Sequence, residues 1–258
     1  MANTREYWVD KDNRAKVARE HTKEMSSKYK DEIDKSIHGT KIYDVGFCCD
    51  KTDIKDSMNI VIEDIDSVSA VLKYGDDNTA ILNFSSYKNP GGMFLNGSKA
   101  QEECLCHESY LYNVLSQFTQ SFYDWNNQNK NKALYKNRGL YSPHVVFERG
   151  INSKTVAVIT CAAPNKSAAQ KYLQIPDEEN SVVLQSRIRY VLDIARDNGV
   201  KTLILGAYGC GVFGQDATEV ATVFKNLLET THKCFDTVVF AIPYGRDGNY
   251  HKFLSTFK

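Results

Sequence analysis

The sequence predicts a three-layer α/β/α fold built on a mixed sheet, with a helical extension at the amino terminus. Predicted strands alternate with predicted helices through the second half of the chain. The later strands are apolar on both faces, which is typical of strands buried between two layers of helices. With 258 residues, 42% of them apolar, the chain can bury a full core. We expect residues 1–258 to form a single domain, with residues 1–40 as an accessory helical region.

The first elements follow from composition and periodicity. Residues 11–37 are rich in Lys, Arg, Glu and Ala and contain few helix breakers, so they predict a helix whose sparse apolar stripe places it at the periphery. Alternating and β-branched residues predict short strands at 41–47 and 60–62. Residues 67–74 predict a helix, and the apolar run 79–84 is typical of a buried parallel strand.

The middle of the chain predicts a helix followed by a loop. Ser98 begins a capping-box pattern and apolar residues recur behind it at helical spacing, so residues 98–118 predict a helix. Asn and Lys dominate residues 124–139, which predicts a solvated surface loop. The remaining predicted strands are 145–147, 155–161, 202–205 and 237–242, and the remaining predicted helices are 182–196 and 216–228.

Charge and cysteine usage narrow the classes of partner. The 32 Lys plus Arg balance the 32 Asp plus Glu, so the net charge is zero. Electrostatic binding to nucleic acid or to an anionic membrane requires a basic face, so neither partner is expected. No apolar run approaches the ~20 residues of a membrane span. The odd number of cysteines, seven, and an amino terminus without an apolar signal segment predict reduced thiols and a cytoplasmic protein. Nothing in the sequence demands an oligomer, so we expect a monomer.

One cysteine-rich segment has to be weighed as a metal site. Cys104, Cys106 and His107 lie close together in the chain. However, residues two positions apart on a helix point about 200° away from each other. No second Cys or His pair has the spacing of a zinc finger either, so we expect no metal there.

Two glycine-containing loops carry the chemistry. Asn89-Pro-Gly91-Gly92 follows a predicted strand and leads to the start of the helix predicted at 98–118. Free N–H groups at a helix start suit an anion, although composition alone also allows a plain turn. The segment 206–214 contains four glycines in nine residues, which a mere turn does not explain, so it predicts a phosphate-cradling loop. Segment 206–214 fits neither a Walker A loop nor the dinucleotide fingerprint. Because ligands sit at the carboxyl ends of strands, the two loops predict a diphosphate held from both sides.

The same loops carry a family resemblance. Residues 82–103, with Pro-Gly-Gly followed by Gln-Glu-Glu, resemble the signature of microbial-type poly(ADP-ribose) glycohydrolases, a branch of the macrodomain fold. Residues 142–149, 160–165 and 205–214 resemble further blocks of that family in the same order. The resemblance implies an enzyme that cleaves ribose–ribose O-glycosidic bonds in poly(ADP-ribose) on modified proteins and releases ADP-ribose, with no metal or other cofactor. Met93 replaces the third glycine of the family pattern, which bears on the substrate more than on the chemistry.

The resemblance also implies roles for individual residues. Glu103 would be the catalytic acid and base, and Glu102 would bind the ribose being cleaved. Adjacent helical residues point about 100° apart, which agrees with two distinct roles. Asn83 would lie near the distal ribose, against which Phe213 would pack. The full set of expected substrate contacts is Asn83, Asn89, Gly91, Gly92, Gln101, Gly209, Cys210, Gly211, Val212, Phe213 and Gly214.

Two other functions remain open at this stage. Met93 could favour a hydrolase that removes mono-ADP-ribose from a protein or nucleic acid. A non-catalytic ADP-ribose-binding module is the other alternative, although the presence of both glutamates speaks against it. Tyr208 and Tyr244 are candidates for stacking on adenine. Asn165 is expected to support a loop rather than touch substrate.

Overall fold

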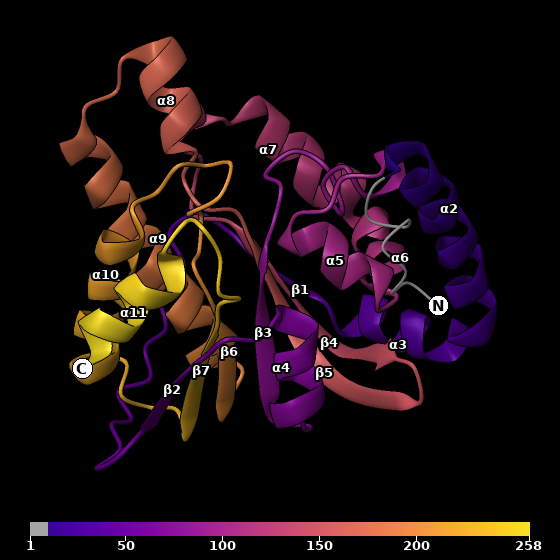
Figure 1. The fold of residues 1–258 in the computed structure, drawn as a ribbon, viewed down its shortest axis with the longest axis horizontal. Coiled ribbons are helices and arrows are strands. Elements are labelled where there is room, and N and C mark those ends of the chain that lie inside the picture. The colour runs from indigo at the N-terminus through magenta and orange to yellow at the C-terminus, as the bar shows by residue number, and fades with distance from the viewer. Residues whose placement is uncertain (1–9) are drawn as a thin grey trace.

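The computed structural model of the protein describes residues 10–258 and shows one seven-stranded sheet between two layers of helices (Figure 1). The strand order is β1-β4-β5-β3-β6-β7-β2. Five neighbouring strands, from β5 to β2, run parallel, whereas β4 pairs antiparallel with both β1 and β5. The strands are β1 (Lys41–Tyr43), β2 (Asn59–Glu63), β3 (Thr79–Phe84), β4 (Gly139–Arg149), β5 (Asn152–Cys161), β6 (Thr202–Leu205) and β7 (Thr237–Ala241). The predicted mixed sheet is confirmed.

The α-helices are α2 (Lys11–Lys28), α3 (Lys30–Gly39), α4 (Ser67–Tyr74), α5 (Gln101–His107), α6 (Leu111–Leu115), α7 (Trp125–Gln128), α8 (Lys166–Leu173), α9 (Asp177–Asp197), α10 (Ala217–Glu229) and α11 (Asn249–Phe257). Helices α9, α10 and α11 cover one face of the sheet, and α4, α5 and α6 cover the other (Figure 1). Successive residues of β3 serve both layers, because Leu82 packs into the first core and Ile81 into the second. None of the helices described within residues 10–258 is both long and apolar enough to span a bilayer.

The structure confirms the elements whose signals are local. The helix predicted at 67–74 and the strands predicted at 79–84 and 202–205 have the observed bounds. The other predicted strands are present with shifted ends. The seven cysteines are all free thiols. The helices α8 and α11 were not predicted, and residues 1–9 of the predicted accessory region lie outside the described residues.

Two predicted helices are interrupted. The helix predicted at 11–37 is divided into α2 and α3 by Tyr29, whose backbone leaves the helical region (φ −123°, ψ 35°). The helix predicted at 98–118 begins only at Gln101 and breaks after His107. Ser109 there forms a bridge with Phe147 of β4. Tertiary pairing with the sheet therefore overrides the helical periodicity.

The prediction of a solvated loop at 124–139 is wrong. The segment contains α7 and a 3₁₀ turn, η4 (Asn131–Ala133), and it follows a π-helical turn, η3 (Thr119–Asp124). Arg138 within it is 5% exposed, donates to Asp44 at 2.6 Å, and lies 4.6 Å from the ring of Trp125. The three lysines of this segment are exposed, whereas Asn126, Tyr135 and Arg138 are buried and hold its inward side in place.

Candidate active site

The carboxyl end of β3 carries a buried asparagine. Asn83 is fully buried, and its Nδ2 donates to Glu102 Oε1 at 3.1 Å and to Thr160 Oγ1 at 3.3 Å. Its Oδ1 has no hydrogen-bond partner among residues 10–258. A buried acceptor left unpaired costs about 1–3 kcal/mol, which makes this oxygen a suitable receiver for a ligand hydroxyl.

Gln101 fastens the first turn of α5 to the sheet. Its Oε1 accepts from the N–H of Phe84 at 2.9 Å, and its Nε2 donates to the carbonyl of Leu82 at 2.9 Å and to Ser67 Oγ at 3.2 Å. Both amide hydrogens are thus used within the protein. In this geometry Gln101 positions the two glutamates that follow it, and a direct contact with substrate would require these bonds to break.

Glu102 is enclosed at the base of the site. Its side chain is 3% exposed, and its Oε2 accepts from the N–H of Ser86 at 2.7 Å. Burial away from water raises the pKa of Glu102 from 4.5 to about 8, the hydrogen bonds from Ser86 and Asn83 oppose that shift, and the neighbouring Glu103 adds to it. Burial therefore favours the protonated form of Glu102.

Glu103 lies beside it and is held by two backbone donors. Its Oε1 accepts from the N–H of Met93 and its Oε2 from the N–H of Ala100, both at 2.9 Å. The bond to Ala100 satisfies a free donor at the start of α5. Because both oxygens are fixed and the residue is 5% exposed, the carboxyl group has one well-defined orientation.

The glycine pair is required by this arrangement. Gly91 and Gly92 have φ angles of +64° and +61°, a region that residues with a Cβ rarely adopt. A Cβ at Gly92 would lie 2.6 Å from Glu103 Oε1 and 2.9 Å from Glu102 Oε2. The two carboxyl groups therefore close on the same bare stretch of backbone. Met93 has a φ of −110°, so its backbone needs no glycine. Its N–H binds Glu103, and the residue is 45% exposed.

The amino-terminal helix braces this first loop. Arg14 of α2 is buried, and its Nε donates to the carbonyl of Gly97 at 2.7 Å. Gly97 has a φ of +76°, and a Cβ there would overlap the carbonyl of Lys11. Helix α2 is therefore not merely peripheral, since it fixes the end of the loop that presents Met93.

The second glycine loop joins β6 to α10. Gly209 and Gly214 have φ angles of +75° and +71°, and a Cβ at Gly214 would overlap Ser167 Oγ at the start of α8. Behind the loop, Gln215 and Asn180 exchange two hydrogen bonds of 2.9 Å between their side-chain amides. This buried reciprocal pair supports the loop from behind. Within the loop, the N–H of Cys210 donates to the carbonyl of Ala207 at 3.1 Å and the N–H of Gly214 to the carbonyl of Gly211 at 3.0 Å.

The outer part of this loop faces solvent. Gly211 and Val212 are exposed, the latter by 83%, and Phe213 is half-buried. Burial raises the pKa of the Cys210 thiol to about 12, so Cys210 is not an activated nucleophile. The phosphate-binding role of the loop 209–214 stays a prediction.

A pair of tyrosines links the two loops. Tyr87, in the first loop, stacks on Tyr135 with ring centroids 4.1 Å apart and planes 12° apart. Tyr135 also meets Phe213 of the second loop edge-to-face at 6.1 Å. Sequence reasoning missed both tyrosines. The only signal was an aromatic residue within the Asn- and Lys-rich stretch around position 135.

A buried arginine supports these loops from below. Arg187 of α9 is fully buried and donates to Asn137 Oδ1 at 2.7 Å, to the carbonyl of Leu134 at 3.3 Å and to the carbonyl of Ala162. It thereby joins the segment before β4 to the loop after β5. Sequence reasoning missed it, because an arginine within an amphipathic helix is typical of a solvated position.

The remaining predicted residues separate into different roles. Tyr208 is fully buried and its hydroxyl donates to the carbonyl of Cys161 at 3.0 Å, so the prediction that it stacks on adenine is wrong. Tyr244 is 63% exposed. Asn165 caps α8 by accepting from the N–H of Ala168 at 3.0 Å, which confirms its supporting role. Asn89 is exposed, and its carbonyl accepts from the N–H of Gly92 at 3.1 Å.

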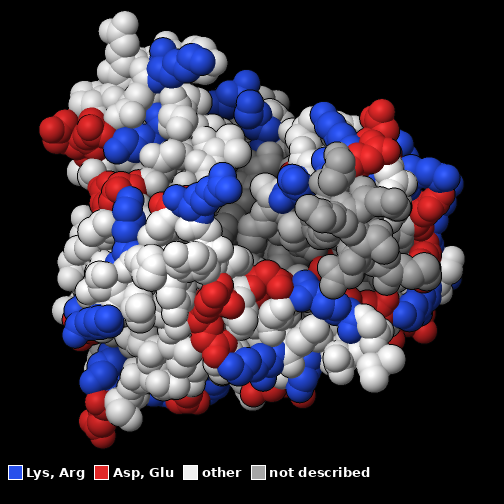
Figure 2. All heavy atoms as spheres, viewed as in Figure 1, with Lys and Arg blue, Asp and Glu red and all other residues white. Residues whose placement is uncertain are grey.

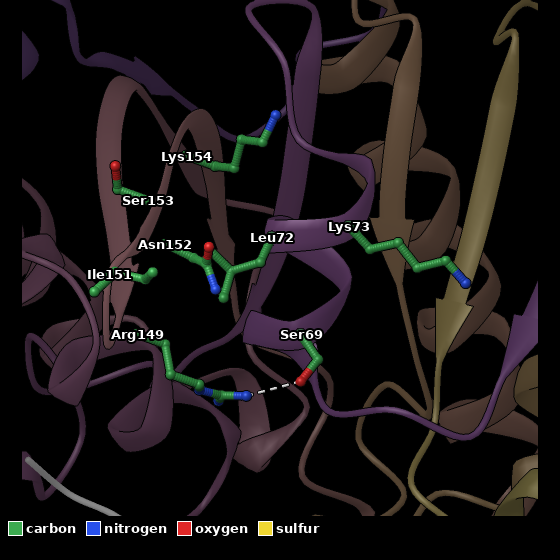
Figure 3. A pocket seen from close by; sticks show the side chains of 8 residues that line it. All are labelled: Ser69, Leu72, Lys73, Arg149, Ile151, Asn152, Ser153 and Lys154. Carbon is green, nitrogen blue, oxygen red and sulfur yellow. Dashed lines mark hydrogen bonds between the residues drawn. The ribbon is translucent and has the colours of Figure 1, made fainter.

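A pocket of about 650 Å³ lies elsewhere, between α4 and the turn joining β4 to β5 (Figure 3). Two of its three cations are paired with acids. Arg149 contacts Asp66 at 2.9 Å and also Glu108, and Lys73 contacts Glu63. Because neither glycine loop nor the glutamate pair lines it, this pocket is not part of the site.

The fold and the carboxyl pair together define a macrodomain-like protein with an acidic centre beneath two glycine loops. Its residues 13–150 match the family described as microbial-type PARG (poly(ADP-ribose) glycohydrolase), catalytic domain. The chain belongs to the microbial-type poly(ADP-ribose) glycohydrolase family. No curated protein sequence matches it.

Solved structures agree with this assignment. Poly(ADP-ribose) glycohydrolase from Thermomonospora curvata is 30% identical, with a TM-score of 0.84, and the match covers 95% of this chain and 100% of that one. The same enzyme bound to the inhibitor ADP-HPD matches with a TM-score of 0.81, 30% identity and coverage of 95% and 99%. The enzyme from Deinococcus radiodurans in complex with ADP-ribose matches with a TM-score of 0.76, 30% identity and coverage of 88% and 97%.

Proposed function

We propose that this protein is a poly(ADP-ribose) glycohydrolase that hydrolyses ribose–ribose O-glycosidic bonds and releases ADP-ribose. The observation that carries the proposal is the pair of buried glutamates, Glu102 and Glu103, fixed beneath Gly92 by backbone donors. A module that only binds ADP-ribose has no need of two such carboxyl groups. In this proposal the backbone of the loop 209–214 holds the diphosphate. The relative from Deinococcus radiodurans was solved in complex with ADP-ribose, which supports a ligand of this class.

The chemistry follows from the properties of the bond. Cleavage passes through an oxocarbenium-like state at the anomeric carbon. In our proposal the Glu103 carboxyl donates a proton to the leaving ribose oxygen as the carbon–oxygen bond breaks. Water then adds to the anomeric carbon, and its proton returns to Glu103. The acid is regenerated, and the net change is addition of one water across the bond.

Glu102 has a different part in this scheme. Because burial favours the protonated form of Glu102, the two carboxyl groups do not both carry a charge beside the substrate diphosphate. Its neutral carboxyl can hydrogen-bond a ribose hydroxyl together with Asn83, whose Oδ1 has no protein partner within residues 10–258. This placement would orient the ribose toward Glu103.

The test is incubation with an auto-modified poly(ADP-ribose) polymerase. The wild type should release free ADP-ribose from the chains. Glu103→Gln should abolish release while retaining micromolar binding of ADP-ribose, and Glu178→Gln, a matched change at an exposed glutamate of α9, should leave release unchanged. Normal turnover by Glu103→Gln would refute the assignment of the acid.

A second candidate is hydrolysis of mono-ADP-ribose from a modified protein or nucleic acid. The observation that favours it is Met93, which stands where the family pattern has glycine, binds Glu103 through its N–H and is 45% exposed. The same incubation separates the two functions, because this activity would remove the last unit and leave the ribose–ribose bonds intact.

We further propose that the substrate chains are attached to modified proteins and that the protein acts as a cytoplasmic monomer. Residues 1–258 would form a single catalytic domain, with residues 1–40 as its accessory part. The bond from Arg14 to Gly97 supports this division, because it makes the accessory helix a brace for the catalytic loop.

A further inference from the structure

The net charge of zero conceals an uneven distribution. Residues 84–101 contain two lysines and no Asp or Glu, and residues 125–138 contain three lysines, one arginine and no Asp or Glu. Both segments lie at the end of the sheet where β3 finishes (Figure 1). Figure 2 shows Lys and Arg side chains gathered on the upper part of the same face, where Figure 1 places α7 and the loop after β3.

Three of these lysines are available to a ligand. Lys88, Lys130 and Lys136 are exposed, and none of them forms an ion pair among residues 10–258. Lys132, by contrast, lies 3.7 Å from Glu179 and is partly neutralised. We name Lys88, Lys130 and Lys136 the basic rim.

The two segments of the basic rim are joined directly. Asn127 Nδ2 donates to the carbonyl of Lys88 at 3.0 Å, and the hydroxyl of Tyr87 donates to the carbonyl of Asn129 at 3.0 Å. The N–H of Lys136 in turn donates to that hydroxyl at 3.3 Å. The two segments that carry these lysines are therefore hydrogen-bonded to each other and are not independent loops.

The backbone between Lys130 and Lys136 is strained. Asn131, Lys132, Ala133 and Tyr135 all have positive φ angles, between 44° and 65°, although none is glycine. Each such residue costs on the order of 1 kcal/mol or more and persists only where the surroundings impose it. Here the imposing contacts are the Tyr135 stack and the buried arginine below it. Strain of this kind is found mainly at functional sites.

The basic rim is adjacent to the catalytic carboxyl groups. Lys88 is two residues from Ser86, whose N–H binds Glu102, so their Cα atoms are within about 7.6 Å. In the proposed reaction the diphosphate of the terminal unit lies at the loop 209–214. The rest of the chain leaves from the carboxyl pair, and therefore passes beside Ser86 and Lys88.

We propose that the basic rim binds the diphosphate groups of the poly(ADP-ribose) units that lie beyond the bond being cleaved. The inference rests on the proposed function and adds the recognition of the polymer as a polyanion, because every unit of the chain carries two phosphates. A rim of three unpaired ammonium groups suits such a repeating anion by counterion release. Free ADP-ribose has no further unit and would not use it.

The experiment compares long chains with monomer. Lys88→Gln, Lys130→Gln and Lys136→Gln are combined in the Glu103→Gln background, which prevents turnover, and affinities for long poly(ADP-ribose) and for ADP-ribose are measured across salt concentrations. The ratio of long-chain to monomer affinity should fall about tenfold at low salt. Raising the salt concentration from about 50 to about 200 mM should weaken long-chain binding in both proteins. Because the triple variant neutralises three fewer phosphates, its loss of affinity over this range should be roughly 20-fold smaller than that of the Glu103→Gln background.

The matched control removes three exposed lysines elsewhere: Lys35 on α3, Lys154 on β5 and Lys201 before β6. It should leave the affinity ratio within twofold of the unsubstituted background. An unchanged ratio in the rim variant, or an equal fall in the control, would overturn the basic rim. If instead the wild type released no ADP-ribose while the ratio still fell, the proposed function would fail and the basic rim would stand.

Discussion

Glu102→Gln should make the protein more stable at neutral and alkaline pH. The wild-type carboxyl is buried and its pKa is raised from 4.5 to about 8. At 1.36 kcal/mol per pH unit, this difference corresponds to about 5 kcal/mol of folding free energy above pH 8. Glutamine has the shape of the protonated carboxyl and carries no charge. Both oxygens of Glu102 accept in the wild type, one from Asn83 Nδ2 and one from the N–H of Ser86, so the glutamine NH2 requires the Asn83 amide to turn and present its Oδ1.

The sign follows from proton uptake. Between pH 4.5 and about 8 the folded protein holds a proton on Glu102 that the unfolded chain has released. The wild type therefore loses stability as pH rises through this window. The glutamine variant has no such loss. The free energy of unfolding of Glu102→Gln should therefore exceed that of the wild type by a small amount at pH 5, by about 3 kcal/mol at pH 7, and by a constant amount above pH 8.

Urea denaturation followed by circular dichroism at pH 5 to 9 measures this directly. The midpoint difference between Glu102→Gln and wild type should grow with pH, whereas Glu178→Gln, exposed on α9, should show no such growth. A difference between Glu102→Gln and wild type that did not change with pH would refute the reasoning. It would mean that Glu102 is ionised in the folded protein.

Three further predictions follow from the geometry of the site. Gly92→Ala should lower the free energy of unfolding by about 1–3 kcal/mol and reduce turnover at least 100-fold, because the φ of +61° and the nearby carboxyl oxygens leave no room for a Cβ. Gly211→Ala, at an open position of the second loop, should keep the wild-type urea midpoint. Arg187→Met should lower the free energy of unfolding by at least about 3 kcal/mol, because two buried carbonyls and the half-buried Asn137 Oδ1 lose their donor. Limited proteolysis should then cut near residue 135, and resistance there would contradict the supporting role of Arg187. Met93→Gly should lower the free energy of unfolding by about 0.5–1 kcal/mol, and it should change KM for poly(ADP-ribose) chains more than kcat. An unchanged KM would show that the Met93 side chain does not contact the substrate.

Local signals predicted the fold well. The strand at 79–84 is an apolar run, and the helix at 67–74 is capped by Asp66, whose carboxyl accepts from two N–H groups within the next three residues. Signals of this kind involve neighbours in the chain and are legible in the sequence. The helix predicted at 98–118 failed because Ser109 pairs with a strand far along the chain.

The site divides in the same way. Of the two glycine loops, the loop 206–214 stands out in the sequence through its composition, whereas the glutamate pair is singled out by the family resemblance of residues 82–103. The sequence does not single out Tyr87, Tyr135 or Arg187, because their roles depend on contacts with residues far along the chain. The hydrogen-bond partners of Arg187 lie 25 to 53 residues away, and the two stacked tyrosines are 48 residues apart. The residues next to a tyrosine or an arginine in the sequence do not show whether its side chain is solvated or is buried and supports neighbouring elements.

The sequence by itself determined the alternation of strands and helices, the two glycine loops and the identity of the acidic pair, because each is written in residues close together along the chain. Only the tertiary structure decided that Glu102 keeps a proton, that Gly92 has no space for a side chain, and that a strained segment joins the two loops. The physical reason is that a pKa, a close approach and a strained backbone depend on what surrounds a residue in space. Those surroundings come from elements that the fold alone brings together.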